Sequence, residues 1–229
     1  MNAVTLLYAD GVVIPTADNG EAFTTNFAVV VQNLAYTKIV GVWGDGVGGI
    51  PGTWSFAPCS YSRSVPGNLE IWVAGPGEPP FTPSQVAVEY QVLGNVYWDN
   101  NGGYNYSLDP GALDLTPEGI ATAVIGPNVV AVSGGLNGPD LNVEVLVKNI
   151  AYQKQVGIVY TTDNWQTYQN AFGIYSQSLK PDSTPHQLNA EQWNITATVG
   201  SPATGQYAVF YSVAGATYWD NNFGLNYSF

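Results

Sequence analysis

The sequence predicts an all-β protein made of antiparallel sandwich domains. Short runs alternate apolar and polar residues, Gly-, Pro- and Asn-rich stretches separate them, and the whole pattern occurs twice. The alternation is clear in Val143, Val145 and Val147, which would share one face of a strand. No long segment shows the 3.6-residue apolar period of a helix. We therefore expect two tandem immunoglobulin-like antiparallel β-sandwich domains, each with about seven or eight strands.

The second half of the chain repeats the first half in the same order. The stretch VYWDNNGGYNYSL (Val96–Leu108) returns as TYWDNNFGLNYSF (Thr217–Phe229), with nine of thirteen positions identical. An earlier frame, Asn-x-Ala-Tyr-x-Lys-x-Val-Gly, starts at Asn33 and again at Asn149. Each copy has about 110 residues, whereas solenoid repeats have about 20 to 50, so each copy is predicted to be a domain.

The repeat also sets the expected domain limits. The first domain is predicted at residues 1–110 and the second at 118–229. Residues 111–117 between them belong to a stretch rich in Pro, Gly and Asp, which is typical of a linker.

The charge of the chain narrows the classes of partner. Five Lys and Arg against seventeen Asp and Glu give a net charge of -12. Nucleic-acid binding needs clustered cations that displace counterions, and attraction to an anionic membrane surface needs cations too. We therefore expect no nucleic-acid partner and no membrane partner, and a neutral oligo- or polysaccharide suits the chain better. The oligomeric state is left open.

Compartment and location are only weakly indicated by the sequence. The chain has one cysteine, Cys59, so it can form no disulfide within itself, and the N-terminal stretch lacks the basic flank and long apolar run of a signal peptide. No run approaches the roughly 20 apolar residues of a membrane span. A cytoplasmic location is slightly favoured, and prior removal of a leader peptide is the alternative.

The residues that carry most enzyme and metal chemistry are scarce or isolated. The only histidine, His186, has no counterpart in the first half, and the repeated phrase holds one carboxylate per copy, Asp99 and Asp220. A glycosidase needs two carboxylates across the bond, and a zinc site needs several Cys or His ligands. The glycine-rich Gly44–Gly52 lacks the Lys-Ser/Thr of a phosphate loop. We expect no catalytic residue, no metal site and no cofactor, and we expect each Asp to bond the backbone of its own turn.

Aromatic rings and side-chain amides remain as the candidate binding chemistry. Tyr218 and Trp219 are adjacent in a predicted strand and so point to opposite faces, one toward the core and one toward solvent. An exposed ring can cover the apolar face of a pyranose while Asn and Lys bond its hydroxyls. We expect Tyr218, Tyr227 and Trp193 in the core. The tryptophans expected on the surface are Trp54, Trp98, Trp165 and Trp219.

The motifs of the second half, Lys148-Asn-Ile-Ala-Tyr-Gln-Lys154, Asp163-Asn-Trp165, and Tyr218-Trp-Asp-Asn-Asn222, resemble carbohydrate-binding modules of family 21. This family includes starch-binding domains of fungal glucoamylases and glycogen-binding domains of protein phosphatase 1 targeting subunits. The first half has the same frame, so the chain resembles two such modules in tandem. The resemblance implies a non-catalytic immunoglobulin-like sandwich that binds α-1,4-glucans.

The resemblance also implies two surface sites in each half, a stacking platform and a groove. The positions carried over in the second half are Trp165 and Trp219 for the platform, and Asn149, Tyr152, Lys154, Asn221 and Asn226 for the groove. Those in the first half are Trp54, Trp98, Asn33, Tyr36, Lys38, Asn100 and Asn105. The family places a tyrosine where this chain has Ala87 and Ala208. Tyr168 and Tyr175 are further candidates for the groove.

The sequence thus predicts a lectin-like protein with two glycan-binding modules, most simply for starch, glycogen or maltooligosaccharides. A lectin of the same fold with another glycan is the first alternative, because fold alone fixes no ligand. The second is a glycogen-targeting adaptor subunit. Such a subunit needs a basic-Val-x-Phe docking motif, and Lys38-Ile-Val-Gly and Lys154-Gln-Val-Gly both lack its Phe.

Overall fold

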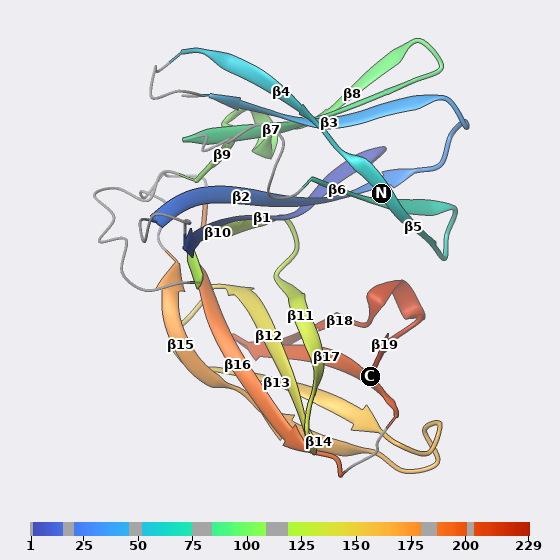
Figure 1. The fold of residues 1–229 in the computed structure, drawn as a ribbon, viewed down its shortest axis with the longest axis vertical. Helices are drawn as coiled ribbons and strands as arrows, with labels where there is room; N and C mark the ends of the chain where they lie inside the picture. The colour runs from blue at the N-terminus through green and yellow to red at the C-terminus, as the bar shows by residue number, and fades with distance from the viewer. Residues whose placement is uncertain are drawn as a thin grey trace. The chain divides into compact units, whose positions relative to one another are not determined.

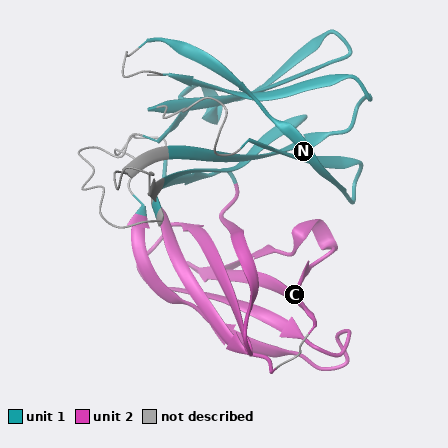
Figure 2. Ribbon diagram, viewed as in Figure 1, with its two compact units in different colours: residues 1–126, 179–189 teal, residues 127–178, 190–229 magenta. Residues whose placement is uncertain are grey.

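The computed structural model describes residues 2–15, 21–45, 52–74, 84–108, 119–179, 187–200 and 204–229. These residues form antiparallel β-sheets with two short 3-10 turns, which confirms the all-β prediction. The chain divides into two compact units (Figure 2): unit 1 is residues 1–126 with 179–189, and unit 2 is residues 127–178 with 190–229. No helix among the described residues has the length and apolar character needed to span a bilayer.

Unit 1 contains two sheets (Figure 1). The first has the order β10-β1-β2-β6-β5, and the second has the order β4-β3-β7-β8, with β9 also paired to β7. The strands of the first sheet are β1 (Val4–Pro15), β2 (Glu21–Gln32), β5 (Ser60–Val65), β6 (Leu69–Ala74) and β10 (Gly119–Ile125). Those of the second are β3 (Lys38–Asp45), β4 (Trp54–Pro58), β7 (Gln85–Val92), β8 (Asn95–Asp99) and β9 (Tyr106–Ser107).

Unit 2 has the same strand order as unit 1, except that its described residues contain no strand that corresponds to β10. Its sheets run β11-β12-β16-β15 and β14-β13-β17-β18, with β19 paired to β17. The first sheet comprises β11 (Val129–Asn137), β12 (Asp140–Lys148), β15 (Ile174–Leu179) and β16 (Ala190–Thr198). The second comprises β13 (Lys154–Thr161), β14 (Gln169–Phe172), β17 (Gln206–Val213), β18 (Ala216–Asp220) and β19 (Tyr227–Ser228).

Each unit has more strands than the seven or eight expected. The strands β9 and β19 are two residues long, too short for alternation to reveal them, and β10 adds a further strand to unit 1. The predicted linker at 111–117 lies outside the described residues. Gly119–Ile125, at the start of the predicted second domain, pairs with β1 in unit 1. The limits 1–110 and 118–229 stay predictions.

Each unit has its own apolar core, filled mainly by β-branched side chains that alternate along the strands. In unit 2 the core includes Val143, Val145 and Val147, the residues expected to share a face. A buried tyrosine links the two sheets in each unit: the Tyr90 hydroxyl donates to the carbonyl of Gln32, and the Tyr211 hydroxyl donates to the carbonyl of Lys148. Buried hydroxyls need such partners, so these bonds fix how the two sheets meet.

The repeated aspartates link the sheets as well. Asp99 accepts from the backbone N–H of Leu6 at 2.7 Å, and Asp220 accepts from that of Ala131 at 2.8 Å. In both units the donor belongs to a strand that bulges at that residue, β1 or β11. A tyrosine hydroxyl, from Tyr106 or Tyr227, supplies a second donor. The aspartate is structural, as expected, but it joins distant strands. Asp220 also bonds its own turn, through the N–H of Asn222.

Candidate functional site

The asparagine-rich loop after β8 and β18 has the same backbone in both units. Four of its asparagines have positive φ: Asn101 and Asn222 at 52° and 51°, and Asn105 and Asn226 at 57° each. Asparagine adopts this left-handed conformation more readily than other residues with a side chain. The loop geometry is therefore one physical reason for the repeated asparagines, which includes the predicted glycan contacts Asn105 and Asn226.

Two other predicted contacts, Asn100 and Asn221, cap the 3-10 turns η2 (Asn101–Gly103) and η3 (Asn222–Gly224). The side-chain oxygen of each accepts a backbone N–H, from Gly103 or Gly224, at 3.0 Å. The amide NH₂ of each cap takes no part in this bond and is chemically able to donate to a ligand. A sugar hydroxyl is an acceptor for such a donor.

The four tryptophans predicted on the surface are all exposed. Trp98 and Trp219 are 49% and 55% exposed, and Trp54 and Trp165 are exposed as well. Their neighbours on the opposite face behave as expected, since Tyr218, Tyr227 and Trp193 pack against the core of unit 2. Each adjacent Tyr-Trp pair therefore divides its rings between core and solvent. That these indoles contact carbohydrate stays a prediction.

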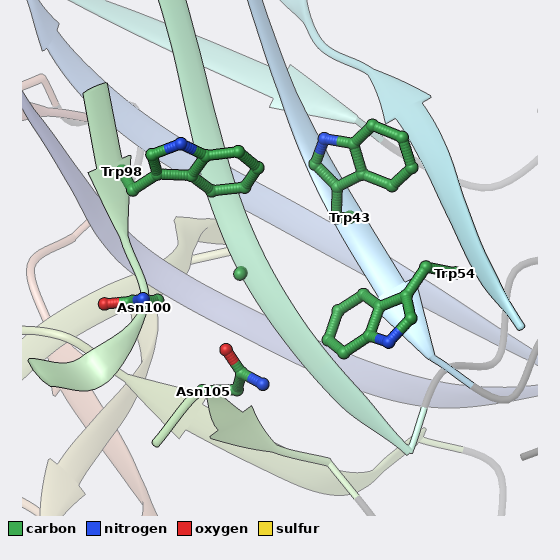
Figure 3. A pocket seen from close by; sticks show the side chains of 6 residues that line it. Trp43, Trp54, Trp98, Asn100 and Asn105 are labelled. Carbon is green, nitrogen blue, oxygen red and sulfur yellow. The ribbon is translucent and has the colours of Figure 1, made fainter. Parts of the chain in front are cut away.

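In unit 1 two of these tryptophans and the asparagine loop share one groove of about 520 Å³. Its lining comprises Trp43, Trp54, Ala87, Trp98, Asn100 and Asn105. Figure 3 shows three indoles and two amides around this space. Its size lies in the range of ligand pockets, and apolar rings with a few polar groups are typical of such pockets.

Sequence reasoning missed Trp43 in this groove. It lies in β3 and follows Gly-Val in a mostly apolar run, so it resembles a core tryptophan at first sight. The alternation with buried Val42 was the available signal, because it places the ring of Trp43 on the outer face.

In unit 2 the two predicted platform tryptophans lie over the same strand, β17. The indole N–H of Trp165 donates to Gln206 at 2.6 Å, and the ring of Trp219 lies 5.9 Å from that of Phe210. Gln206 and Phe210 are four residues apart on one strand and so share a face. Phe210 in turn contacts Phe172 edge-on at 6.0 Å. Aromatic side chains therefore cover this face.

The backbone of Trp165 is held in a left-handed conformation, φ 66°, by the turn around Asp163. The carboxylate accepts from the N–H and hydroxyl of Thr167 and from the hydroxyl of Thr161. These bonds, those from Thr167 first, lower the pKa of Asp163 to about 2. Trp54, which the sequence pairs with Trp165, instead begins β4 opposite Asp45. The two tryptophans thus occupy different local structures.

The two predicted groove lysines are buried in ion pairs. Lys38 bonds Asn33 at 2.6 Å and Glu70 at 2.7 Å, and its side chain is 2% exposed. In unit 2, Lys154 bonds Asn149 and Glu191, each at 2.7 Å, with 3% of its side chain exposed. The sequence suggested that each lysine would lie exposed beside a tyrosine ring, but the structure buries both lysine side chains. The Asn–Lys–Glu cluster holds the intervening loop, and direct contact of either lysine with sugar stays a prediction.

Among the described residues, the tyrosine carried by this loop is the most exposed aromatic of each unit, Tyr36 at 100% and Tyr152 at 95%. A second exposed tyrosine belongs to the same cluster through Trp193, whose indole N–H donates to Glu191 and whose ring meets Tyr175 edge-on at 5.9 Å. Unit 1 repeats this contact with Tyr61 and Trp72. The structure thus places Tyr175, a sequence candidate, and Tyr61, which sequence reasoning missed, near the loop.

A hollow lies between this loop and the β-hairpin beside it in both units. In unit 2 it has a volume of about 700 Å³ and is lined by residues 151 and 153–155 of the loop and 212–217 of the hairpin. In unit 1 it has a volume of about 260 Å³ and is lined by residues 37–39 and 91–96. Each unit therefore presents two separate candidate surfaces, the tryptophan face and the hollow beside the exposed tyrosine loop.

Comparison with known proteins assigns part of the chain to a family. Residues 131–229 match the model of the carbohydrate/starch-binding module, family 21. This segment is a family-21 module. It contains β12 to β19 and all the residues of unit 2 discussed above except the first residues of β11.

Curated proteins are similar to part of the chain as well. A stretch of 83 residues is 35% identical to protein phosphatase 1 regulatory subunit 3B of Xenopus tropicalis and covers 36% of this chain and 27% of that protein. Over 94 residues the chain is 32% identical to glucoamylase 1 of Rhizopus oryzae, covering 40% of this chain and 14% of the enzyme. The matches thus span about a quarter or less of these relatives.

Among solved structures, the starch-binding domain of Rhizopus oryzae glucoamylase in complex with β-cyclodextrin and maltoheptaose is 32% identical. The match covers 45% of this chain and 92% of that domain, with a TM-score of 0.36. The carbohydrate-binding module of the muscle glycogen-targeting subunit of protein phosphatase 1 is 21% identical, with a TM-score of 0.35. That match covers 44% of this chain and 74% of the other.

Proposed function

We propose that the protein is a non-catalytic, lectin-like binder of α-1,4-glucans, with one family-21 module in each half. The observation that carries this proposal is the exposed indole beside an asparagine loop, Trp98 with Asn100 and Trp219 with Asn221. A flat apolar ring next to fixed amide donors suits a pyranose, which has apolar C–H faces and a rim of hydroxyls.

The ligand class is supported by the family of residues 131–229 and by the relatives. The family is described as carbohydrate- or starch-binding, and one relative is a glucoamylase whose starch-binding domain was solved with maltoheptaose. A neutral glucan also suits a chain with a net charge of -12, because binding it requires no cationic surface.

A second module in residues 1–126 is supported by strand order and by matching contacts. The order β4-β3-β7-β8 repeats as β14-β13-β17-β18, and the Asn–Lys–Glu cluster and the Asp99 link to β1 have counterparts in unit 2. Two weak sites on one chain can raise avidity for a polysaccharide by about 10² to 10⁴ when both engage. Duplication would therefore help retention on starch or glycogen more than binding of a short sugar.

Retention on amylose tests this function. Trp98→Ala and Trp219→Ala should each weaken retention, and the double variant should weaken it further, without loss of fold by circular dichroism. Leu136→Ala is the matched control, because Leu136 is an exposed apolar residue on the other sheet of unit 2 and should leave retention unchanged. Full retention by the double variant would contradict the proposal, and so would release of shortened sugars from maltoheptaose.

A glycogen-targeting adaptor is a second candidate, favoured by the 35% identity with a phosphatase regulatory subunit. On this hypothesis, the protein would bind glycogen and a phosphatase catalytic subunit at once. Co-sedimentation of purified catalytic subunit with glycogen only when this protein is present would support it. If this protein sediments with glycogen but the catalytic subunit does not, the result contradicts the adaptor hypothesis and supports glucan binding without a phosphatase partner.

A further inference from the structure

The tryptophan faces of the two units differ at one position of the sheet. Trp43 in β3 lies opposite Ala87, and Val159 in β13 lies opposite Ala208. Since Ala87 and Ala208 occupy the same place in the repeat, Trp43 and Val159 are structural counterparts. Unit 1 thus has a third indole on this face, where the family-21 module has a smaller aliphatic side chain.

Two neighbours change together with Trp43. Phe56 lies opposite Trp43, whereas Asn170 lies opposite Val159. Likewise Glu89 lies opposite Gly41, whereas Phe210 lies opposite Gly157. The trio Trp43, Phe56 and Glu89 in unit 1 therefore corresponds to Val159, Asn170 and Phe210 in unit 2.

Contacts within the unit 1 trio fix the indole of Trp43. Its ring lies 5.4 Å from that of Phe56 at an angle of 55°, and its N–H donates to the carboxylate of Glu89. Glu89 is buried and also accepts from the side chain of Gln91. A buried carboxylate needs its donors, so the indole N–H is committed to Glu89. Trp43 can then offer a ligand only the carbon surface of its ring.

The two trios are alternative ways to fill the same space on the sheet. A Cβ on Gly41 would lie 2.2 Å from the ring of Phe56, and a Cβ on Gly157 would lie 2.6 Å from the ring of Phe210. An aromatic ring therefore lies over the glycine in both units. In unit 1 the ring is that of Phe56 in β4, whereas in unit 2 it is that of Phe210 in β17, the counterpart of β7. In unit 1 this choice leaves room for Trp43 to stand in the groove with Trp54 and Trp98.

We propose that Trp43 is a specificity-determining residue that gives unit 1 a three-walled glucan groove, whereas unit 2 holds the glucan on an open platform. Glu89 and Phe56 are positioning residues for this wall. The inference rests on the proposed function and refines it, because it assigns the two units different binding modes for the same ligand. Unit 1 should enclose a segment of several sugar residues between its indoles.

The test measures maltoheptaose binding by calorimetry, using the full chain with Trp219→Ala so that unit 1 dominates. In that parent, Trp43→Val should weaken binding by about tenfold, the equivalent of about 1.4 kcal/mol. Trp43→Phe, which keeps a ring, should restore most of the affinity. Glu89→Ala, which removes the acceptor of the indole N–H, should also weaken binding, and Glu89→Gln, which keeps an acceptor, should restore most of the affinity.

A combined variant guards against misfolding of Trp43→Val. Trp43→Val, Phe56→Asn and Glu89→Phe together copy the packing of unit 2 and should fold, yet bind as weakly as Trp43→Val. In a Trp98→Ala parent, where unit 2 dominates, Trp43→Val should have no effect. Either an unchanged affinity in the Trp219→Ala parent or an equal loss in both parents overturns the inference.

Failure of the inference and failure of the function are distinguishable. If the unsubstituted protein binds maltoheptaose and Trp43→Val leaves the affinity unchanged, the proposed glucan binding is supported and the role of Trp43 is refuted. If the Trp219→Ala parent alone loses all binding, unit 1 is no glucan site and the inference falls, while unit 2 retains the proposed function. If the unsubstituted protein does not bind any α-glucan, both fall.

Discussion

Replacing Lys154 by methionine removes the cation that is paired with the buried carboxylate of Glu191. In the described residues around it, Glu191 keeps a single neutral donor, the indole N–H of Trp193 at 3.2 Å. The side chains of Lys154 and Glu191 are 3% and 9% exposed, so solvent can replace little of the lost interaction. Breaking a buried pair by removing one partner costs about 3 to 5 kcal/mol. We expect unit 2 to lose stability of this size.

Hydrogen exchange measures this loss unit by unit. A loss of about 3 to 5 kcal/mol speeds amide exchange in the protected strands β13 and β16 by roughly 10² to 10⁴. Lys38→Met is the matched variant and should have the same effect on unit 1 only. Acceleration of less than about tenfold, the value of a surface ion pair, would refute the assignment of Lys154 to the scaffold.

Three further predictions test other local assignments. The pKa of Asp163, about 2, lies below its value in an unfolded chain, so the stability that the ionised carboxylate gives the turn is complete above about pH 4 and is lost as the pH falls toward 2. The indole NMR signal of Trp165 should therefore shift only over that range. The Asp163→Ala variant should show no such shift. Gly157→Ala should destabilise unit 2 by about 1 to 3 kcal/mol in urea unfolding, because its Cβ would lie 2.6 Å from Phe210, whereas Gly135→Ala, with open space around it, should be neutral. Asp220→Ala should cost about 1.5 to 3 kcal/mol through the lost bonds to Ala131 and Tyr227, and a change below about 0.5 kcal/mol would contradict that role.

The sequence predicted the fold class because period-two alternation reports directly on which residues face a core. It also separated core from surface rings in the Tyr218-Trp219 pair, since neighbours in a strand must point to opposite faces. It did not predict β10 as a strand of unit 1. Alternation identifies a strand but carries no information about which strand it pairs with.

The binding residues were predicted less completely than the fold. Lysine is usually exposed, so Lys154 read as a surface donor, and its burial depends on Glu191, which is remote in sequence. Asparagine suits both left-handed backbone and sugar binding, so sequence alone could not show that Asn226 serves the loop. Trp43 was missed because the groove forms only when residues of four strands and the asparagine loop come together.

The most direct test of the account is an indole ¹⁵N–¹H spectrum of the full chain titrated with maltoheptaose. Glucan stacking on the exposed faces predicts that the signals of Trp98 and Trp219 shift in a saturable way and that Trp219→Ala removes only its own signal from the responding set. Signals of Trp98 and Trp219 that stay in place while the protein is retained on amylose would show that the glucan binds elsewhere.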